Sequence, residues 1–407
     1  MKSSFTKGWL KVNDKIKHIL LGITGGIAAY KICDLIRLLK KQGHDIDVIM
    51  TKNAMEFITP LTIQTLTGKP VYTELFSLIN DTDISHISLA DRADIIVVAP
   101  ATANFIGKIS SGIADDLLTT TIFASKSTVL IVPSMNTNMW DNPIVKNNIK
   151  HLQKFYHIMQ PAEGLLACGV YGAGRLPDVE DIYNEINCVL TEKTLNGKKI
   201  VITAGPTVEE LDPVRYISNY SSGKMGYSIA KVAKELGATV TLVTGPVSQS
   251  PPFGVKVISV KSAEDMLNAC KKEMNADIFI MAAAVCDYKP IVRSNQKIKK
   301  DKEELTLKLS KNPDILTYVS QNRKKGAIVV GFAAETENVL KNAHKKLVEK
   351  KVDLIVANKV NEEGSGFGTD TNKITLITKK GVTPFPLMKK EEVANAIFQY
   401  IVENLIN

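Results

Sequence analysis

The chain has 407 residues, of which 44% are hydrophobic and 23% charged, the proportions of a globular protein with two or three domains. Its 51 Lys and Arg residues exceed its 42 Asp and Glu residues, and the formal net charge of +9 favours either a solvated lysine-rich surface or an anionic partner. Aromatic residues make up only 6% and are not interleaved with basic blocks, which argues against a surface that stacks on single-stranded nucleic acid.

The cysteine pattern and the apolar runs predict a cytoplasmic protein that does not span a membrane. The cysteines are Cys33, Cys168, Cys188, Cys270 and Cys286. They are odd in number, widely spaced and without a Cys-x-x-Cys pair, which disfavours a disulfide framework or a thiolate zinc site. Residues Met1–Lys17 contain five lysines but no apolar signal segment. The longest apolar runs, such as Ile278–Val285, are too short to cross a bilayer.

Short β-branched runs alternate with amphipathic segments of helix length, the pattern of parallel sheets covered by helices on both faces. The expected strands of the first half are His18–Ile23, Ile46–Met50, Ile95–Ala99 and Thr128–Val132. Those of the second half are Lys199–Thr203, Thr239–Thr244, Ile278–Ala282, Ala327–Val330, Leu354–Ala357 and Lys373–Thr378. The expected helices include Ile27–Gln42, Ser228–Leu236 and Ser262–Glu273. The polar segment Glu192–Lys199 separates the two series, so we expect two domains, 1–190 and 191–407.

A glycine-rich turn, Gly22-Ile-Thr-Gly-Gly-Ile-Ala-Ala29, follows the first strand and opens the first helix. Gly25 and Gly26 would let backbone N–H groups approach a phosphate, although a tight turn between strand and helix would explain the same glycines. The spacing is not G-x-G-x-x-G, and no acidic residue follows the second strand in Met50–Asn53. Both departures argue against an NAD-dependent oxidoreductase and favour a mononucleotide or a simple phosphate.

Small and amide side chains follow the next two strands, in Pro100-Ala-Thr-Ala-Asn104 and in Pro133–Trp140, where they could hold a planar ring. His86 lies just before the third strand, and a lone histidine there is either a structural group or a catalytic base. Cys168 lies in the segment Leu166–Arg175, which has three glycines and an arginine suited to phosphate. We expect that segment to be a mobile loop.

These segments, in this order, resemble the homo-oligomeric flavin-containing cysteine decarboxylases, and above all the phosphopantothenoylcysteine decarboxylases of coenzyme A synthesis. The resemblance implies a flavodoxin-like domain with FMN, in which His86 is the catalytic base, Asn136 contacts the substrate carboxylate and Cys168 is the proton donor on a flap. The usual Pro-Ala-Ser-Ala-Asn segment has Thr102 here, which keeps the hydroxyl. The residues implied to bind FMN are Gly26, Ile27, Ala28, Thr51, Asn53, Thr102, Ala103 and Asn104.

In the second half, Ser221-Ser-Gly-Lys224 comes directly before a helix, as in an anion-binding loop. It lacks the Walker pattern G-x-x-x-x-G-K-[ST], so a P-loop ATPase is excluded. Asp287 follows a buried strand, at the edge of the sheet where ligands bind. Lys297 lies in the polar stretch Pro290–Glu304, which is either a solvated loop or a mobile lid that neutralises a triphosphate.

From about Lys198 to Asn407 the order of motifs resembles the phosphopantothenate–cysteine ligases. The resemblance implies a CTP-dependent domain in which Asn219 holds an acyl-cytidylate and Mg²⁺ bridges phosphates, without identifying protein ligands for the metal. Cys286 stands where a small Ala or Ser is expected. The residues implied to bind CTP are Ala282, Ala283, Asp287, Lys297, Asn312, Pro313, Asp314, Ile315, Phe332, Lys346 and Lys350.

We therefore expect an α/β protein with two Rossmann-like three-layer domains, an FMN-dependent decarboxylase in 1–190 and a CTP-dependent ligase in 191–407. The implied substrates are 4′-phosphopantothenate, L-cysteine and CTP, and the implied assembly is a homo-oligomer with a trimeric decarboxylase core and ligase domains in dimers. The alternative is a non-enzymatic FMN-binding regulatory subunit. The presence of His86, Asn136 and Cys168 in one chain disfavours it.

Overall fold

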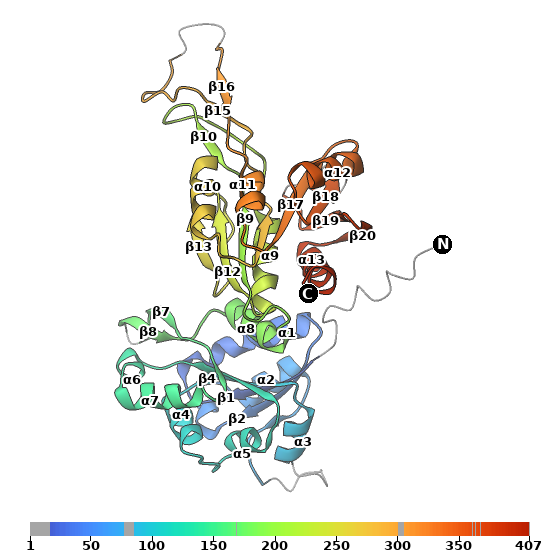
Figure 1. Ribbon diagram of the computed structural model, residues 1–407. Helices are drawn as coiled ribbons and strands as arrows, with labels where there is room; N and C mark the ends of the chain where they lie inside the picture. Colours follow the sequence, from blue (N-terminus) through green and yellow to red (C-terminus); the bar gives the residue numbers. More distant parts are fainter. Residues whose placement is uncertain are drawn as a thin grey trace. The chain divides into compact units, whose positions relative to one another are not determined.

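The computed structural model describes residues 17–76, 85–167, 169–299, 305–359, 361–362, 364–366 and 368–406. They form two compact units, one ending at Thr191 and the other extending from Glu192 to the C-terminus (Figure 1). Each unit has helices on both faces of a mainly parallel sheet, which confirms the predicted fold class.

The sheet of the first unit is parallel throughout and has the order β3-β2-β1-β4-β5-β6. The strands are β1 (His18–Ile23), β2 (Asp45–Met50), β3 (Val71–Tyr72), β4 (Ile95–Ala101), β5 (Thr128–Pro133) and β6 (His157–Ile158). Without the two-residue β3, the order is the 2-1-3-4-5 order of flavodoxin-like sheets. It reverses direction between β1 and β4, which is where such sheets bind ligands.

Helices bury both faces of this sheet, which explains why its strands are continuous apolar runs. The helices are η2 (Ile27–Lys31), α1 (Ile32–Lys41), η3 (Lys52–Ala54), α2 (Pro60–Thr67), α3 (Ser85–Arg92), α4 (Ala103–Ser110), α5 (Leu117–Ala124), α6 (Thr137–Trp140), α7 (Pro143–Leu152) and α8 (Val179–Leu190). Ile19 and Leu21 of β1 pack in one core with α1, α2 and α8, whereas Leu20 packs in the other with α3, α4, α5 and α7. The predicted helix Ile27–Gln42 therefore exists, with a first turn of 3-10 geometry.

The second unit has an eight-stranded sheet in the order β13-β12-β9-β14-β17-β18-β19-β20. The strands are β9 (Lys199–Ala204), β12 (Thr239–Thr244), β13 (Lys256–Ser259), β14 (Ile278–Met281), β17 (Ile328–Glu335), β18 (Leu354–Lys359), β19 (Thr371–Thr378) and β20 (Gly381–Lys389). One core contains α9 (Lys224–Glu235) and α13 (Lys390–Asn404). The opposite core contains α10 (Ala263–Lys272), α11 (Ile315–Asn322) and α12 (Val339–Glu349).

The prediction of a wholly parallel second sheet is wrong at one edge. β19 is antiparallel to β18, and β20 is antiparallel to β19. Only Lys379 and Lys380 join β19 to β20, too few residues for the crossover that a parallel pair needs. β20 was not predicted because Pro384 and Pro386 interrupt its apolar pattern, and prolines are tolerated there because β20 is an edge strand.

Short antiparallel hairpins lie outside the main sheets. In the second unit, β10 (Val208–Glu210) pairs with β11 (Tyr216–Ser218), and β15 (Tyr288–Pro290) pairs with β16 (Leu309–Lys311). Figure 1 shows these hairpins beyond the carboxyl ends of the central strands. The polar stretch Pro290–Glu304 is thus largely the connection of a hairpin, although residues 300–304 lie outside the described residues.

The first unit has one such hairpin, formed by β7 (Ala162–Leu165) and β8 (Tyr171–Arg175). The expected loop Leu166–Arg175 is therefore in large part a strand.

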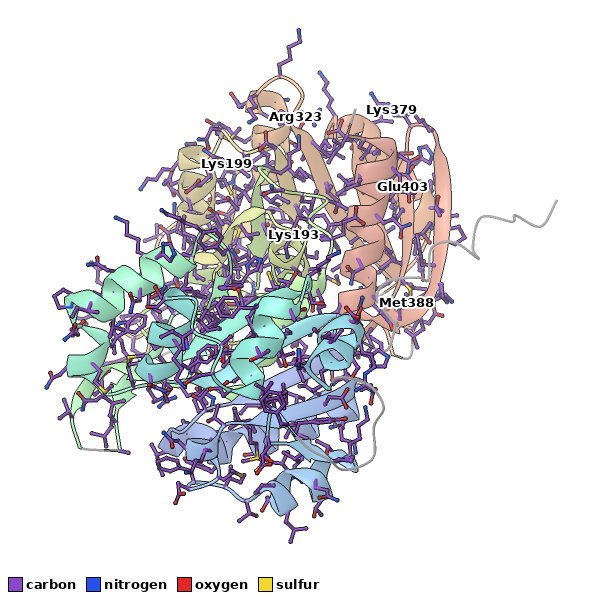
Figure 2. All side chains as sticks on the ribbon, turned by 90° about the horizontal axis from the view of Figure 1, so that it is seen from below. Lys193, Lys199, Arg323, Lys379, Met388 and Glu403 are labelled. Carbon is purple, nitrogen blue, oxygen red and sulfur yellow. The ribbon has the colours of Figure 1, made fainter. Side chains whose placement is uncertain are left out.

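The segment Glu192–Lys199, predicted to be a polar linker, belongs in part to the second core. Leu195 is fully buried there, and its backbone N–H donates to the Leu236 carbonyl at 2.9 Å. Lys193, labelled in Figure 2, donates its Nζ to the Glu235 carbonyl at 2.7 Å. A cut that separates the units therefore belongs before Glu192.

Disulfide bonds and membrane-spanning helices can be examined in the described residues. Among the described residues, Cys33, Cys188, Cys270 and Cys286 form no disulfide, and Cys168 lies outside them. None of the helices in the described ranges has the length and apolar composition needed to span a membrane.

The buried carboxyl group of Glu235 gives the second unit a pH-dependent stability. Burial raises the pKa of Glu235 to about 7, outweighing the nearby Lys231 and Lys193. Between about 4.5 and about 7 the folded state binds a proton that the unfolded chain has lost, so the free energy of unfolding falls as the pH rises through this window. Glu235→Gln should remove this loss and stabilise the unit by about 1–3 kcal/mol at pH 8.

Denaturant unfolding of wild type and variant at pH 5 and pH 8 measures the effect, with Glu349→Gln on an exposed helix face as the matched control. A stability difference between wild type and Glu235→Gln that is the same at both pH values would contradict the assignment.

Candidate active sites

Each unit has a large cavity at the carboxyl ends of its central strands. The volumes are about 720 Å³ in the first unit and about 700 Å³ in the second, within the range of small-molecule sites. The first cavity lies beside the ends of β1 and β4, and the second beside the ends of β9 and β14. Both are the points at which the strand order reverses, where open α/β sheets bind their ligands.

Three loops that follow β1, β2 and β4 are bonded and packed together around the first cavity. The Thr24 hydroxyl donates to the Pro100 carbonyl at 2.6 Å and accepts the Thr102 N–H at 3.1 Å. At Gly25, an added Cβ would overlap Asn53. Glycine is therefore required for the β1 loop to lie against the β2 loop.

Most residues implied to bind FMN line this cavity. Those present are Gly26, Ile27, Thr51, Asn53, Thr102, Ala103 and Asn104, together with Asn136. Ala28 does not line it, because its side chain is buried in the core beneath the first helical turn. His86, on α3, does not line it either, and its buried Nδ1 has no hydrogen-bond partner. Cys168 lies outside the described residues, although the preceding Ala167 lines the cavity.

The lining fits a flavin mononucleotide. The Gly26 N–H donates to the Thr24 carbonyl at 2.9 Å, so the groups that could meet a phosphate are those at the start of the helix at Ile27; small side chains leave room for a planar ring. Sequence reasoning missed the charged group at the rim, where the Lys108 Nζ lies 2.7 Å from Asp115 and 3.3 Å from Asp116. The sequence does show a short acidic segment before α5, but that segment alone does not indicate that Lys108 is its partner.

The β7–β8 hairpin packs directly on the segment that contains Asn136. The Met135 N–H donates to the Gly174 carbonyl at 2.9 Å. An added Cβ at Gly174 would overlap the Met135 carbonyl, and one at Gly172 would lie 2.7 Å from the Thr137 hydroxyl. Arg175, expected to suit phosphate, pairs instead with Asp178 at 2.6 Å.

The second cavity brings Asn219 next to the loop after β14. Asn219 follows β11, and its Nδ2 donates to the Ala284 carbonyl at 2.9 Å. Thr207 supports the same loop, since its hydroxyl accepts the Cys286 N–H at 2.9 Å and its own N–H donates to Ala284. Cys286 is buried, which raises the pKa of its thiol and makes it a packing group.

The cavity contains all but one of the residues implied to bind CTP. They are Ala282, Ala283, Asp287, Asn312, Pro313, Asp314, Ile315, Phe332, Lys346 and Lys350. Lys346 donates to the Phe332 carbonyl at 2.7 Å, and burial lowers its pKa. Lys350 pairs with Asp314. Lys297 does not line the cavity; its exposed side chain lies in the connection between β15 and β16.

A second pair of lysines reaches the cavity from the opposite face of the sheet, from α9 and α13. Lys224 donates to the Gly368 carbonyl at 2.8 Å and to Asp370 at 2.6 Å. Lys390 is 5% exposed and donates to the carbonyls of Gly366 and Thr369. Lys390 was missed because no motif surrounds it, whereas Lys224 belongs to the predicted anion-binding loop. Within the described ranges, no group of three or more His, Cys, Asp or Glu residues could hold a metal ion.

Gly25→Ala should empty the first cavity of flavin, because the added Cβ has no room beside Asn53. Overpacking of this kind costs about 1–3 kcal/mol, so we expect about 5-fold to 150-fold weaker retention of the flavin by a folded protein. The visible absorbance of the purified variant measures it. Gly107→Ala is the control, since nothing lies within 4 Å of a Cβ there. Full flavin occupancy in Gly25→Ala would show that the close contact of the loops is not needed.

Comparisons with known families cover both units. Residues 9–191 match the family model described as Flavoprotein, and residues 195–405 match the model described as DNA/pantothenate metabolism flavoprotein C-terminal domain. A crystal structure of the C-terminal domain of Coenzyme A biosynthesis bifunctional protein CoaBC is 42% identical, with a TM-score of 0.45. That match covers 52% of this chain and 97% of the other.

Curated relatives align over nearly the whole chain. The Coenzyme A biosynthesis bifunctional proteins CoaBC of Bacillus subtilis (strain 168) and Escherichia coli (strain K12) are 47% and 42% identical to this chain. Both alignments cover 95% of this chain, and they cover 96% and 97% of those relatives. A flavin-binding regulatory subunit would account for the first half alone. The chain belongs to the family of bifunctional coenzyme A biosynthesis proteins.

Proposed function

We propose that the unit beginning at Glu192 joins cysteine to 4′-phosphopantothenate with CTP, and that the unit ending at Thr191 decarboxylates the product to 4′-phosphopantetheine with FMN. The observation that carries the proposal is the position of the two cavities. Each lies at the reversal of strand order and is lined by residues that the two resemblances assign to FMN or to CTP.

Decarboxylation requires an electron sink next to the carboxylate, and FMN supplies it by accepting a hydride from the thiol-bearing carbon and returning it later. His86 removes the thiol proton, so that this carbon becomes a thioaldehyde. Asn136 binds the carboxylate, the C–C bond breaks, and CO₂ leaves its electron pair on an enethiolate. Cys168 would give a proton to the carbon that has lost CO₂, and with FMN returned to its starting state the net redox change would be zero.

Ligation proceeds by two displacements. A carboxylate oxygen of 4′-phosphopantothenate attacks the α-phosphorus of CTP and pyrophosphate leaves; the cysteine nitrogen then attacks the acyl carbon and CMP leaves. Lys346 and Lys350 neutralise phosphate charge, and Asn219 orients the acyl-cytidylate beside Ala284. Mg²⁺ would be held chiefly by the phosphates and by water, its usual manner of binding to nucleotides.

We further propose a homo-oligomer, with trimeric first units and dimeric second units. His86 does not line the cavity of its own chain, so it would act on the cavity of another copy. In the second unit, exposed apolar side chains gather on the two hairpins and their connections: Val214, Tyr216, Tyr288, Ile291, Val292, Leu305, Leu307 and Leu309. Burying them against a second copy would remove them from water.

Separated fragments test the assignment of activities. A fragment ending at Thr191 should fold, retain FMN and release CO₂ from phosphopantothenoylcysteine, because its core is complete. A fragment beginning at Glu192 should convert CTP to CMP and pyrophosphate only when phosphopantothenate and cysteine are both present. The full chain is the control for both assays. Consumption of CTP by the first fragment, or release of CO₂ by the second, would reverse the assignment.

Mixed oligomers test whether His86 acts between copies. His86→Asn and Asn136→Ala should each abolish decarboxylation alone. Coexpressed with distinguishable tags and purified as mixed oligomers, they should recover about a quarter to a third of the wild-type rate, since an intact cavity meets an intact histidine at one site in four of randomly mixed trimers and at one in three of trimers that contain both variants. CO₂ release per bound FMN is the measurement. No recovery in an oligomer shown to contain both variants would place His86 and Asn136 in the same copy.

A further inference from the structure

The connection that carries Lys297 is held to the β10–β11 hairpin by a backbone clamp at Ile298. The Ile298 N–H donates to a carboxylate oxygen of Asp212 at 3.1 Å, and its carbonyl accepts the Arg215 Nη2 at 2.7 Å. Both polar groups of this peptide segment are therefore engaged by one ion pair. Lys297 is the residue directly before the clamp and is itself exposed.

The carboxylate of Asp212 is buried and accepts several hydrogen bonds within the hairpin turn. Its side chain has no exposed surface, and it accepts the N–H groups of Val214 and Arg215 at 2.8 Å each. It also accepts the Arg215 Nε at 3.0 Å and Nη2 at 2.6 Å. The Arg215 guanidinium holds the pKa of the Asp212 carboxyl below its usual range. A buried carboxylate needs such partners, and the oxygen that accepts both Arg215 nitrogens is also the one that accepts the Ile298 N–H.

The same hairpin leads directly to Asn219. Arg215 precedes β11, and Asn219 follows it, with its amide on the Ala284 carbonyl. Asn219, which the resemblance assigns to the acyl-cytidylate, and Lys297, which it assigns to CTP, are thus attached to the two ends of one short element. The Ser294 N–H also donates to the Leu211 carbonyl at 2.9 Å, so the connection is held along the turn rather than at a single point.

We propose that Asp212 is a positioning residue of the ligase: through Ile298 it holds the connection that presents Lys297 to the acyl-cytidylate. The inference rests on the proposed ligase function. An untethered lysine on an exposed connection would lose conformational freedom each time it reached a phosphate, and the clamp removes part of that cost in advance.

Asp212→Asn tests the proposal because it keeps the shape but replaces one acceptor oxygen with donors that face the guanidinium. In the full chain, limited trypsin digestion should cleave after Lys297 and Lys299 about tenfold faster, as the clamp opens more often. Ligase kcat should fall at least about tenfold while the KM for CTP changes less than about twofold, since the cavity that lines the nucleotide is intact. Decarboxylation by the same protein should be unchanged.

Two further variants separate positioning from folding. Ile298→Pro removes the N–H that Asp212 accepts and leaves the ion pair with Arg215 in place, so it should lower ligase kcat as Asp212→Asn does; Ile298→Ala keeps the N–H and should not. Glu264→Gln is the charge-matched control, because Glu264 pairs with Lys289 of the neighbouring strand β15 at 3.1 Å without touching Ile298.

Wild-type cleavage and wild-type ligase turnover in Asp212→Asn would overturn the proposal. It would also be overturned if Ile298→Pro kept full turnover, because the loss in Asp212→Asn would then come from folding. Failure of the wild-type chain to consume CTP would instead contradict the proposed function, and the digestion experiment would still test the clamp.

Discussion

Burial of both faces of each sheet decides where either unit can bind a ligand. Ile19 and Leu21 pack under one layer of helices and Leu20 under the other, and the strands of the second unit follow the same rule. With both faces of a sheet covered, the loops at its strand ends are where residues next to the sheet can meet solvent. The carboxyl ends of parallel strands all lie at the same edge. Thr24, Gly25 and Gly26 after β1, Thr51 after β2 and Thr102 after β4 therefore line the first cavity from loops at that edge.

The long buried strands could be predicted because burial on both faces demands continuous β-branched runs, as in Ile95–Ala99. Each of the predicted runs overlaps a strand of the structure. The antiparallel edge could not be predicted in this way, because Pro384 and Pro386 interrupt the apolar pattern of β20. The hairpin strands, of three to five residues, contain too few residues to show a clear period, and their pairing is set by contacts with distant parts of the chain.

The site residues that could be placed from the sequence are those that directly follow a strand. Motifs placed directly after a strand, such as Pro100–Asn104, lie at the predicted cavities because the strand end fixes them. Lys390 reaches its cavity only through the packing of α13 on α9, which no local pattern reveals. The family resemblance also pointed to His86 and Lys297, but their positions relative to the cavities could not be predicted. Neither residue follows directly after a strand that ends at a cavity. The clamp at Ile298 is likewise invisible in the sequence, because Asp212 and Ile298 are far apart in the chain.

The β7–β8 hairpin is attached to the Asn136 segment through its backbone, whereas some of its side chains remain exposed. The hairpin is attached by the backbone, through Gly172, Gly174 and the hydrogen bond from Met135, whereas Leu165 and Tyr171 are 68% and 74% exposed. Different atoms thus hold the hairpin and face its surroundings. Substitutions at Leu165 and Tyr171 can therefore change the exposed surface of the hairpin without loosening its attachment to the Asn136 segment.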